Sequence, residues 1–89
     1  MKPISIQVTY RKGRPFAAYI YLDRRPGEKS ARQEEVGPEI VADFASDGRA
    51  IGVEIINPDI VTAAEILAAF DRLGLVRPEI ADLSPLVAA

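Results

Sequence analysis

The stretch that decides the fold runs from Glu39 to Asn57 and reads Glu-Ile-Val-Ala-Asp-Phe-Ala-Ser-Asp-Gly-Arg-Ala-Ile-Gly-Val-Glu-Ile-Ile-Asn. Apolar and polar residues alternate on either side of Asp47-Gly48, and an Asp-Gly pair between alternating segments is a strong hairpin signal. The stretch therefore predicts two antiparallel strands joined by a two-residue turn. Asp47 and Gly48 are predicted to form that turn, with both residues at positive φ.

The register of this hairpin follows from where its apolar residues must lie. A two-residue loop places apolar residues opposite one another, namely Phe44 and Ile51, Ala42 and Val53, and Ile40 and Ile55. A three-residue loop with a glycine bulge would instead place Phe44 opposite Ala50 and Ala42 opposite Gly52, which would split the apolar set. Because one buried face requires one consistent register, the two-residue loop is expected.

Two further strands precede this hairpin. Residues 4–10 alternate, residues 11–15 form a turn, and residues 16–22 form a second strand. Apolar residues then pair on one face, namely Tyr10 with Phe16, Val8 with Ala18, Ile6 with Ile20, and Ile4 with Leu22. The other face pairs Gln7 with Tyr19 and Ser5 with Tyr21. A third strand at residues 30–36 is rich in charge, which suits an edge or a strongly exposed position.

A single helix is predicted after the strands. Thr62-Ala63-Ala64-Glu65 is a capping-box pattern that opens a helix, and Gly74 stands where a C-terminal cap belongs. The apolar stripe between them has helical spacing and consists of Ile66, Leu67, Phe70 and Leu73. Beyond the helix, residues 79–83 are expected to form one short helical turn after Pro78.

These elements predict one α+β domain over residues 1–89. Residues 4–58 are expected to form an antiparallel β-meander of about five strands, and residues 59–89 the C-terminal helix and tail. Because a sheet with one apolar face must cover it, the helix is expected to pack on that face.

The composition excludes several kinds of catalytic site. The 89 residues contain no Cys and no His, so disulfides, thiol catalysis, Cys/His zinc sites and a Ser-His-Asp triad are excluded within this chain. The commonest general base near neutral pH is missing as well. The chain is therefore expected to be non-enzymatic, with no catalytic residue, no cofactor and no metal.

The hydropathy and the charge distribution of the chain limit the kinds of partner that we expect for it. The longest apolar run has seven residues, from Phe16 to Leu22, whereas a membrane-spanning helix needs about 20. We therefore expect a cytoplasmic protein that contacts no membrane. Residues 1–32 carry eight Lys and Arg against two acids, and residues 33–89 carry three Arg against eleven acids. A split of this kind can mark an interaction surface.

The middle of the chain resembles a small bacterial family known only as a domain of unknown function. The resemblance covers about residues 4–58 and lies in four elements that follow in order: Ala17-Ala18-Tyr19-Ile20-Tyr21-Leu22, Glu34-Glu35-Val36, Asp43-Phe44-Ala45-Ser46-Asp47-Gly48 and Gly52-Val53-Glu54-Ile55. The family often has an acidic residue where this chain has Phe16, and Asp where this chain has Ala45. The resemblance implies a small β-rich domain and no established activity.

Three acidic residues of the hairpin are candidates for a metal-binding or a catalytic site. Asp43 and Glu54 are predicted to share the polar face, and with Asp47 they could offer oxygen ligands to a hard cation. Because Asp43 lies across from Gly52 and Asp47 lies at the tip, the three do not converge, and they are interpreted as solvated residues. An acid–base pair of Asp43 and Glu54 is the remaining enzymatic alternative.

Tyr19 and Tyr21 form an aromatic platform on the same polar face. Bases can stack on sheet aromatics, and the basic loops at residues 11–14 and 24–25 could bind phosphates. Those loops lie at opposite ends of the second strand, roughly 20 Å apart at about 3.3 Å per residue, and the acidic half would repel a polyanion. We therefore expect a protein contact at the tyrosines, with a weak single-stranded nucleic-acid-binding module as the alternative.

The C-terminal tail offers a second candidate surface. Its apolar residues Ile80, Leu83, Leu86 and Val87 could complete the core, pack across a homodimer or present an amphipathic segment to another protein. The chain is thus expected to be a small interaction or accessory module. It would self-associate, as a homodimer, or bind a partner in an antitoxin-like manner, its acidic half masking a basic protein. The candidate interaction residues are Tyr19, Tyr21, Asp43, Glu54, Ile80, Leu83 and Leu86.

Overall fold

The computed structural model describes residues 5–83 and residue 86, which form a five-stranded antiparallel sheet, one α-helix and one short 3-10 helix. The strands are β1 (Ser5–Arg11), β2 (Arg14–Tyr21), β3 (Arg32–Gly37), β4 (Ile40–Phe44) and β5 (Ala50–Ile55). Helix α1 spans Ala63–Arg72, and the 3-10 helix η1 spans Ile80–Leu83. The predicted α+β class and the short helical turn after Pro78 are confirmed.

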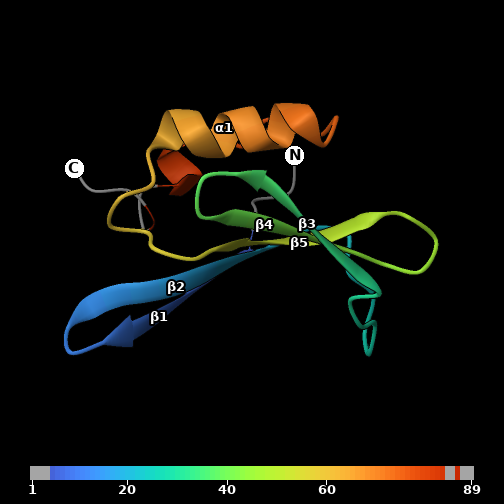
Figure 1. Cartoon of the computed structure of the whole chain (residues 1–89), viewed down its shortest axis with the longest axis horizontal. Coiled ribbons are helices and arrows are strands. Elements are labelled where there is room, and N and C mark those ends of the chain that lie inside the picture. Colours follow the sequence, from blue (N-terminus) through green and yellow to red (C-terminus); the bar gives the residue numbers. More distant parts are fainter. Residues whose placement is uncertain (1–4, 84–85, 87–89) are drawn as a thin grey trace.

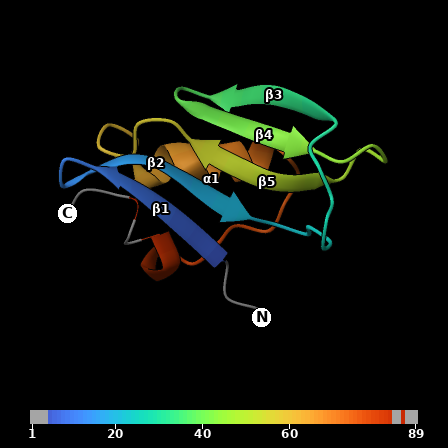
Figure 2. The same cartoon turned by 90° about the horizontal axis from the view of Figure 1, so that it is seen from below.

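The order of the strands differs from the predicted meander. The sheet runs β1-β2-β5-β4-β3, so β5 inserts between β2 and β4 and the chain crosses from β2 to the far edge. Figure 2 shows this order. The burial of the individual strands explains why β5 lies inside the sheet and β3 at its edge. Ile51, Val53 and Ile55 of β5 are fully buried, whereas the charged residues of β3 are exposed. A meander would place the charged strand at the centre of the sheet, where both sides must be paired.

The hairpin between β4 and β5 has a longer loop than predicted. Ala42 pairs with Val53 as predicted, but Phe44 pairs with Ala50 across a register shift. Only Gly48 of the turn has a positive φ, of 93°, because a three-residue loop puts a single residue in the left-handed region. The two-residue turn with Asp47 at positive φ is therefore wrong. The bulge absorbs the extra residue and returns the apolar side chains to one face.

The hairpin between β1 and β2 follows the predicted register over most of its length. Ile6 pairs with Ile20 and Val8 with Ala18, as expected. A register shift after Thr9 pairs Tyr10 with Pro15, so the predicted pairing of Tyr10 with Phe16 is wrong. The bulge leaves the Phe16 side chain 49% exposed. The predicted pairing of Ile4 with Leu22 falls partly outside the described residues.

Helix α1 begins and ends at the predicted signals. Thr62 and Glu65 exchange the two hydrogen bonds of a capping box, at 3.1 Å and 2.9 Å. At the other end, Gly74 has a φ of 69°, and the backbone N–H of Leu75 donates to the carbonyl of Phe70. These are the features of a Schellman motif. Within the described residues, no helix is long and apolar enough to span a membrane.

One apolar cluster unites the strands with the C-terminal segment. Ile66, Ala69 and Phe70 of α1 belong to the same cluster of buried residues as Ala42 and Val53 of the central strands. Figure 1 shows α1 running above the sheet on the side of β3, β4 and β5. Leu83 and Leu86 of the tail also belong to this cluster. The opposite face of the sheet is where the polar candidate residues lie.

Candidate functional site

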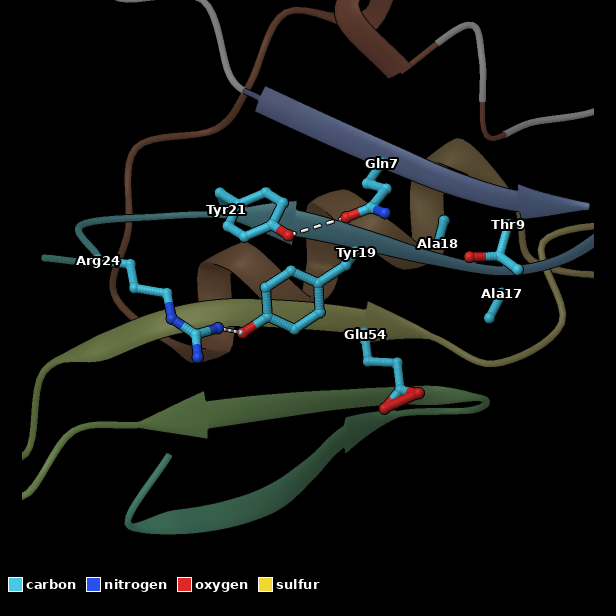
Figure 3. A pocket seen from close by; sticks show the side chains of 8 residues that line it. All are labelled: Gln7, Thr9, Ala17, Ala18, Tyr19, Tyr21, Arg24 and Glu54. Carbon is cyan, nitrogen blue, oxygen red and sulfur yellow. Dashed lines mark hydrogen bonds between the residues drawn. The ribbon is translucent and has the colours of Figure 1, made fainter. Parts of the chain in front are cut away.

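The sheet face opposite α1 is open and carries both predicted tyrosines. Figure 2 views the molecule from this side, with only strands in front of the helix. A shallow pocket of about 310 Å³ lies here (Figure 3), lined by Gln7, Thr9, Ala17, Ala18, Tyr19, Tyr21, Arg24 and Glu54. We define the tyrosine face as the surface formed by Gln7, Thr9, Tyr19, Tyr21 and Glu54.

Asp43 of β4 is almost completely buried, with 7% of its surface exposed. Its carboxylate accepts hydrogen bonds from the Tyr19 hydroxyl at 2.8 Å, the Gln33 amide at 2.8 Å and the Ser30 hydroxyl at 3.0 Å. A buried carboxylate is tolerated only where donors replace water. The interpretation of Asp43 as a solvated residue is therefore wrong. Instead, its carboxylate joins β2, β4 and the start of β3.

The hydrogen bond from Tyr19 to Asp43 spans β5, which lies between their two strands. It can form because Gly52, the residue opposite Asp43, has no side chain. A Cβ atom on Gly52 would overlap the ring and hydroxyl of Tyr19. A glycine inside a strand often marks the close approach of another group, and here that group is the aromatic ring that crosses β5. The predicted pairing of Asp43 with Gly52 is confirmed.

Two partners hold the Tyr19 side chain in place. Its hydroxyl donates to Asp43 and accepts a hydrogen bond from Nη1 of Arg24 at 3.1 Å. Burial, followed by the hydrogen bond to the Asp43 carboxylate, raises the pKa of Tyr19 to about 12. The hydroxyl therefore stays protonated at neutral pH and acts as a donor to Asp43.

Tyr21 is more exposed than Tyr19 and stands edge-on to it. The two ring centres lie 4.8 Å apart with an interplanar angle of 68°, a favoured geometry for aromatic pairs. The Tyr21 hydroxyl donates to Oε1 of Gln7 at 2.9 Å. Because its proton points at Gln7, the Tyr21 oxygen keeps its capacity to accept a hydrogen bond from a ligand.

Glu54 contributes the negative charge of the pocket. It pairs directly with Tyr19 across β2 and β5, and its side chain is partly buried. Figure 3 shows Glu54 and Arg24 on opposite sides of the Tyr19 ring. Arg24 donates to Tyr19 and to the carbonyl of Glu28, whereas the Glu54 carboxylate forms no hydrogen bond or ion pair with another described residue. The pocket thus combines a cation that is hydrogen-bonded to neutral groups with an anion that has no such partner among the described residues.

A second polar cluster surrounds Arg49, at the tip of the β4–β5 hairpin. Its guanidinium contacts Asp47 at 2.8 Å, Glu28 at 2.5 Å and the carbonyl of Asp23 at 2.7 Å. The backbone N–H of Arg25, and then Arg49, hold the pKa of Glu28 below its usual range. Hydrogen bonds from Arg49 lower the pKa of Asp47 as well. The predicted turn residue Asp47 is therefore part of a clamp between the turn and the β2–β3 connection.

The remaining candidate residues do not converge on the pocket. Leu83 and Leu86 are buried in the core of this chain, whereas Ile80 is 65% exposed. Val87 lies outside the described residues. Asp47 is bound to Arg49 at the hairpin tip. Among residues 5–83 and residue 86, no group of three or more acidic side chains is arranged to hold a metal ion.

Sequence reasoning missed most of the polar network. Arg24, Ser30 and Gln33 were not predicted to act with Tyr19 or Asp43, because they lie in the β2–β3 connection and in β3. Gln33 and Ser30 depend on the β3–β4 register, in which Gln33 lies opposite Asp43, whereas Tyr19 reaches Asp43 only because β5 lies between β2 and β4. One available signal was Gly52, since a glycine within an alternating strand indicates a close contact.

A comparison with known protein families finds a match that begins in β2 and ends just after β5. The matched segment contains Tyr19, Asp43, Gly52 and Glu54, and it leaves out β1 and α1. The expected resemblance at residues 4–58 is thus confirmed over a shorter range. No curated protein and no solved structure matches the chain. Residues 17–57 match the model of DUF2283, a family of proteins of unknown function.

Proposed function

We propose that the protein is a non-enzymatic module of the cytoplasm that binds another protein through its tyrosine face, while α1 covers the apolar face of the sheet. The observation that carries the proposal is the open pocket with pre-positioned side chains. Tyr19 is held by Asp43 and Arg24, and Tyr21 is held by Gln7. Aromatic side chains that are already fixed lose little freedom on binding, and tyrosine is enriched at protein interfaces.

The environments of Asp43 and Glu54 support a binding function over a catalytic one. The Asp43 carboxylate is buried and accepts three hydrogen bonds, so taking a proton from a substrate would break its contacts with three donors. Glu54 then stands as a single carboxylate in the pocket. An acid–base mechanism with two carboxylates needs both groups within reach of the substrate.

A nucleic-acid ligand suits this face less well than a protein does. Arg24 is already engaged by Tyr19 and by the carbonyl of Glu28, and the Glu54 carboxylate would repel phosphate. A basic protein partner, as in the antitoxin-like hypothesis, would instead be attracted by the Glu54 carboxylate. The first experiment is therefore designed to separate the two kinds of partner.

The test is affinity capture from native lysate, with and without nuclease, read by mass spectrometry. Three baits are compared: wild type, Tyr21→Ala in the tyrosine face, and Val76→Ala at an exposed position outside it. The proposal expects a protein that survives nuclease and is retained by wild type and Val76→Ala but lost with Tyr21→Ala. A protein retained equally by all three baits would place binding elsewhere. Loss of recovery after nuclease would favour the nucleic-acid hypothesis.

Self-association is a second candidate function, favoured by the edge strand β1. Residues 5–10 of β1 carry no charge, whereas Arg32, Glu34 and Glu35 lie on β3 at the opposite edge. Charge on an edge strand blocks unwanted pairing, and β1 lacks this protection up to Arg11. We therefore propose that β1 pairs with β1 of a second copy. Sedimentation of β1 variants distinguishes this dimer from a monomer.

A further inference from the structure

The pocket of the tyrosine face contains one carboxylate, that of Glu54. Tyr19 gives its proton to Asp43, and Tyr21 gives its proton to Gln7. Arg24 uses Nε and Nη1 within the chain. The acceptors left for a ligand are the Glu54 carboxylate, the Tyr21 hydroxyl and the Thr9 hydroxyl, while Arg24 and the Gln7 amide keep N–H donors. A ligand that pairs with Glu54 must therefore be a donor.

The charge at Glu54 favours a cationic donor, because the cation of the pocket, Arg24, lies on the other side of the Tyr19 ring. Glu54 is partly buried and has no ion-pair partner among the described residues. A partly desolvated carboxylate gains more from a cation than a fully hydrated one does. Aromatic rings attract cations through their quadrupole; the Arg24 guanidinium lies over the Tyr19 ring at 5.8 Å, and Tyr21 supplies a second ring.

A carboxylate beside aromatic rings favours a planar cation over a compact one. A volume of about 310 Å³ leaves room for a side-chain head group beside the rings. A guanidinium group offers five donors in one plane and can stack on an aromatic ring while it binds a carboxylate with two hydrogen bonds. An ammonium group is a point charge with three donors and cannot bind a carboxylate with two parallel hydrogen bonds while it stacks on a ring.

We propose that this pocket receives an arginine side chain of the partner protein, with the guanidinium paired to Glu54 and placed against the tyrosine rings. The inference rests on the proposed function and specifies the chemistry of the partner. Arginine recognition of this kind depends on one carboxylate, so a single isosteric substitution tests it.

The experiment titrates the folded protein with the capped tripeptide acetyl-Gly-Arg-Gly-amide and follows amide and side-chain shifts by NMR. Matched peptides carry citrulline, which is neutral and nearly isosteric, or lysine in place of arginine. We expect saturable shifts at Thr9, Tyr21 and Glu54. We also expect affinity at least tenfold higher for arginine than for citrulline, and higher than for lysine.

Two variants distinguish binding of the peptide in the pocket from nonspecific attraction of a cationic peptide to an acidic protein. Glu54→Gln should weaken binding of the arginine peptide at least tenfold. Glu79→Gln removes the same charge from an exposed residue outside the pocket and should leave binding unchanged. Equal binding of citrulline, equal binding of lysine, equal weakening by both variants, or no saturable shift would each overturn the inference. The spectrum of Glu54→Gln without peptide shows whether the variant is folded, and Tyr21→Phe, which removes an acceptor, gives an independent second variant.

Failure of this inference can be told apart from failure of the proposed function. If the arginine peptide does not bind but capture of a protein still depends on Tyr21, the tyrosine face is an interface without an arginine pocket. If capture is also indifferent to Tyr21→Ala, the proposed function falls as well.

Discussion

At Gly52, the absence of a side chain decides whether Tyr19 can reach Asp43. Gly52→Ala should therefore displace the Tyr19 ring and remove a donor from a buried carboxylate. Overpacking costs about 1–3 kcal/mol and a lost hydrogen bond about 1 kcal/mol, so we expect the free energy of unfolding to fall by about 2 kcal/mol or more. Urea denaturation measures this change.

Tyr19→Ala provides the control for that prediction. With the ring removed, a methyl group at position 52 meets no aromatic atoms of Tyr19, so the penalty of Gly52→Ala should shrink in the Tyr19→Ala background. A double-mutant cycle should give an interaction energy of about 1 kcal/mol or more between the two sites. If the effects of the two substitutions were additive, the position of the Tyr19 ring would not depend on Gly52.

The pKa of Tyr19, raised to about 12, predicts a specific alkaline behaviour. In the unfolded chain tyrosine ionises near its ordinary pKa of about 10, while in the folded protein Tyr19 keeps its proton to higher pH. Its contribution to stability is therefore complete below about pH 10 and is lost as pH rises toward 12. Titration of absorbance at 295 nm, wild type minus Tyr19→Phe, should show a transition near pH 12. A difference transition near pH 10 would contradict the network.

At the scale of elements, Arg49 fastens the β4–β5 turn to the β2–β3 connection. Arg49→Gln should release residues 23–29 and accelerate their amide exchange. Arg77→Gln breaks only the contact with Asp71 and serves as the matched control, with no change at residues 23–29. Unchanged exchange in Arg49→Gln would show that the connection is held by other contacts.

The pH dependence of the same variant follows from the carboxylates that Arg49 contacts. The pKa values of Glu28 and Asp47 are lowered in the folded protein. A lowered carboxyl pKa stabilises the fold above the unfolded value, and that stability is lost as pH falls through the folded value. The gap in urea midpoint between wild type and Arg49→Gln should therefore be larger at pH 7 than at pH 3. An equal gap at both pH values would exclude an electrostatic role.

The elements also show which parts of the fold a sequence pattern can predict. The cap at Thr62, the end of α1 at Gly74 and the hairpin pairs that lie farther from the turns than the bulges follow from local sequence signals, and all are confirmed. The sequence pattern does not predict the bulges near Thr9 and Phe44. A bulge inserts one extra residue into one strand and leaves the alternation of apolar residues on either side of it unchanged.

The order of the strands needed information that no local pattern contains. Alternation predicts that a strand has an apolar face, but it does not say which strand lies beside it. The charge of β3 already indicated an edge position, and an edge position is incompatible with a five-stranded meander in which β3 is central. The hydrogen bond from Tyr19 to Asp43 is missed for the same reason, since it forms only across β5, whereas the donors Ser30 and Gln33 follow from the pairing of β3 with β4.

At the scale of the whole molecule, the two sheet edges are unequal. β3 lies at one edge and belongs to the segment that matches the DUF2283 model, while β1 lies at the other edge and outside that segment. Antiparallel pairing of two β1 strands about Gln7 would place Ile6 opposite Val8 and Ser5 opposite Thr9 of the second copy. Apolar residues would then meet on one face and polar residues on the other, so the strand is self-complementary.

A charge-swap experiment tests this dimer. In Ser5→Lys/Thr9→Lys, each cross-strand pair would bring two cations together, and in Ser5→Glu/Thr9→Glu two anions. Because like charges placed directly opposite destabilise strand pairing, each variant should sediment as a monomer at concentrations where wild type is a dimer. An equal mixture of the two variants should restore the dimer, since every pair then joins opposite charges. Val76→Lys, which adds charge away from β1, should behave as wild type. If wild type itself stays monomeric, or the mixture does not reassociate, the proposed pairing of two β1 strands is wrong.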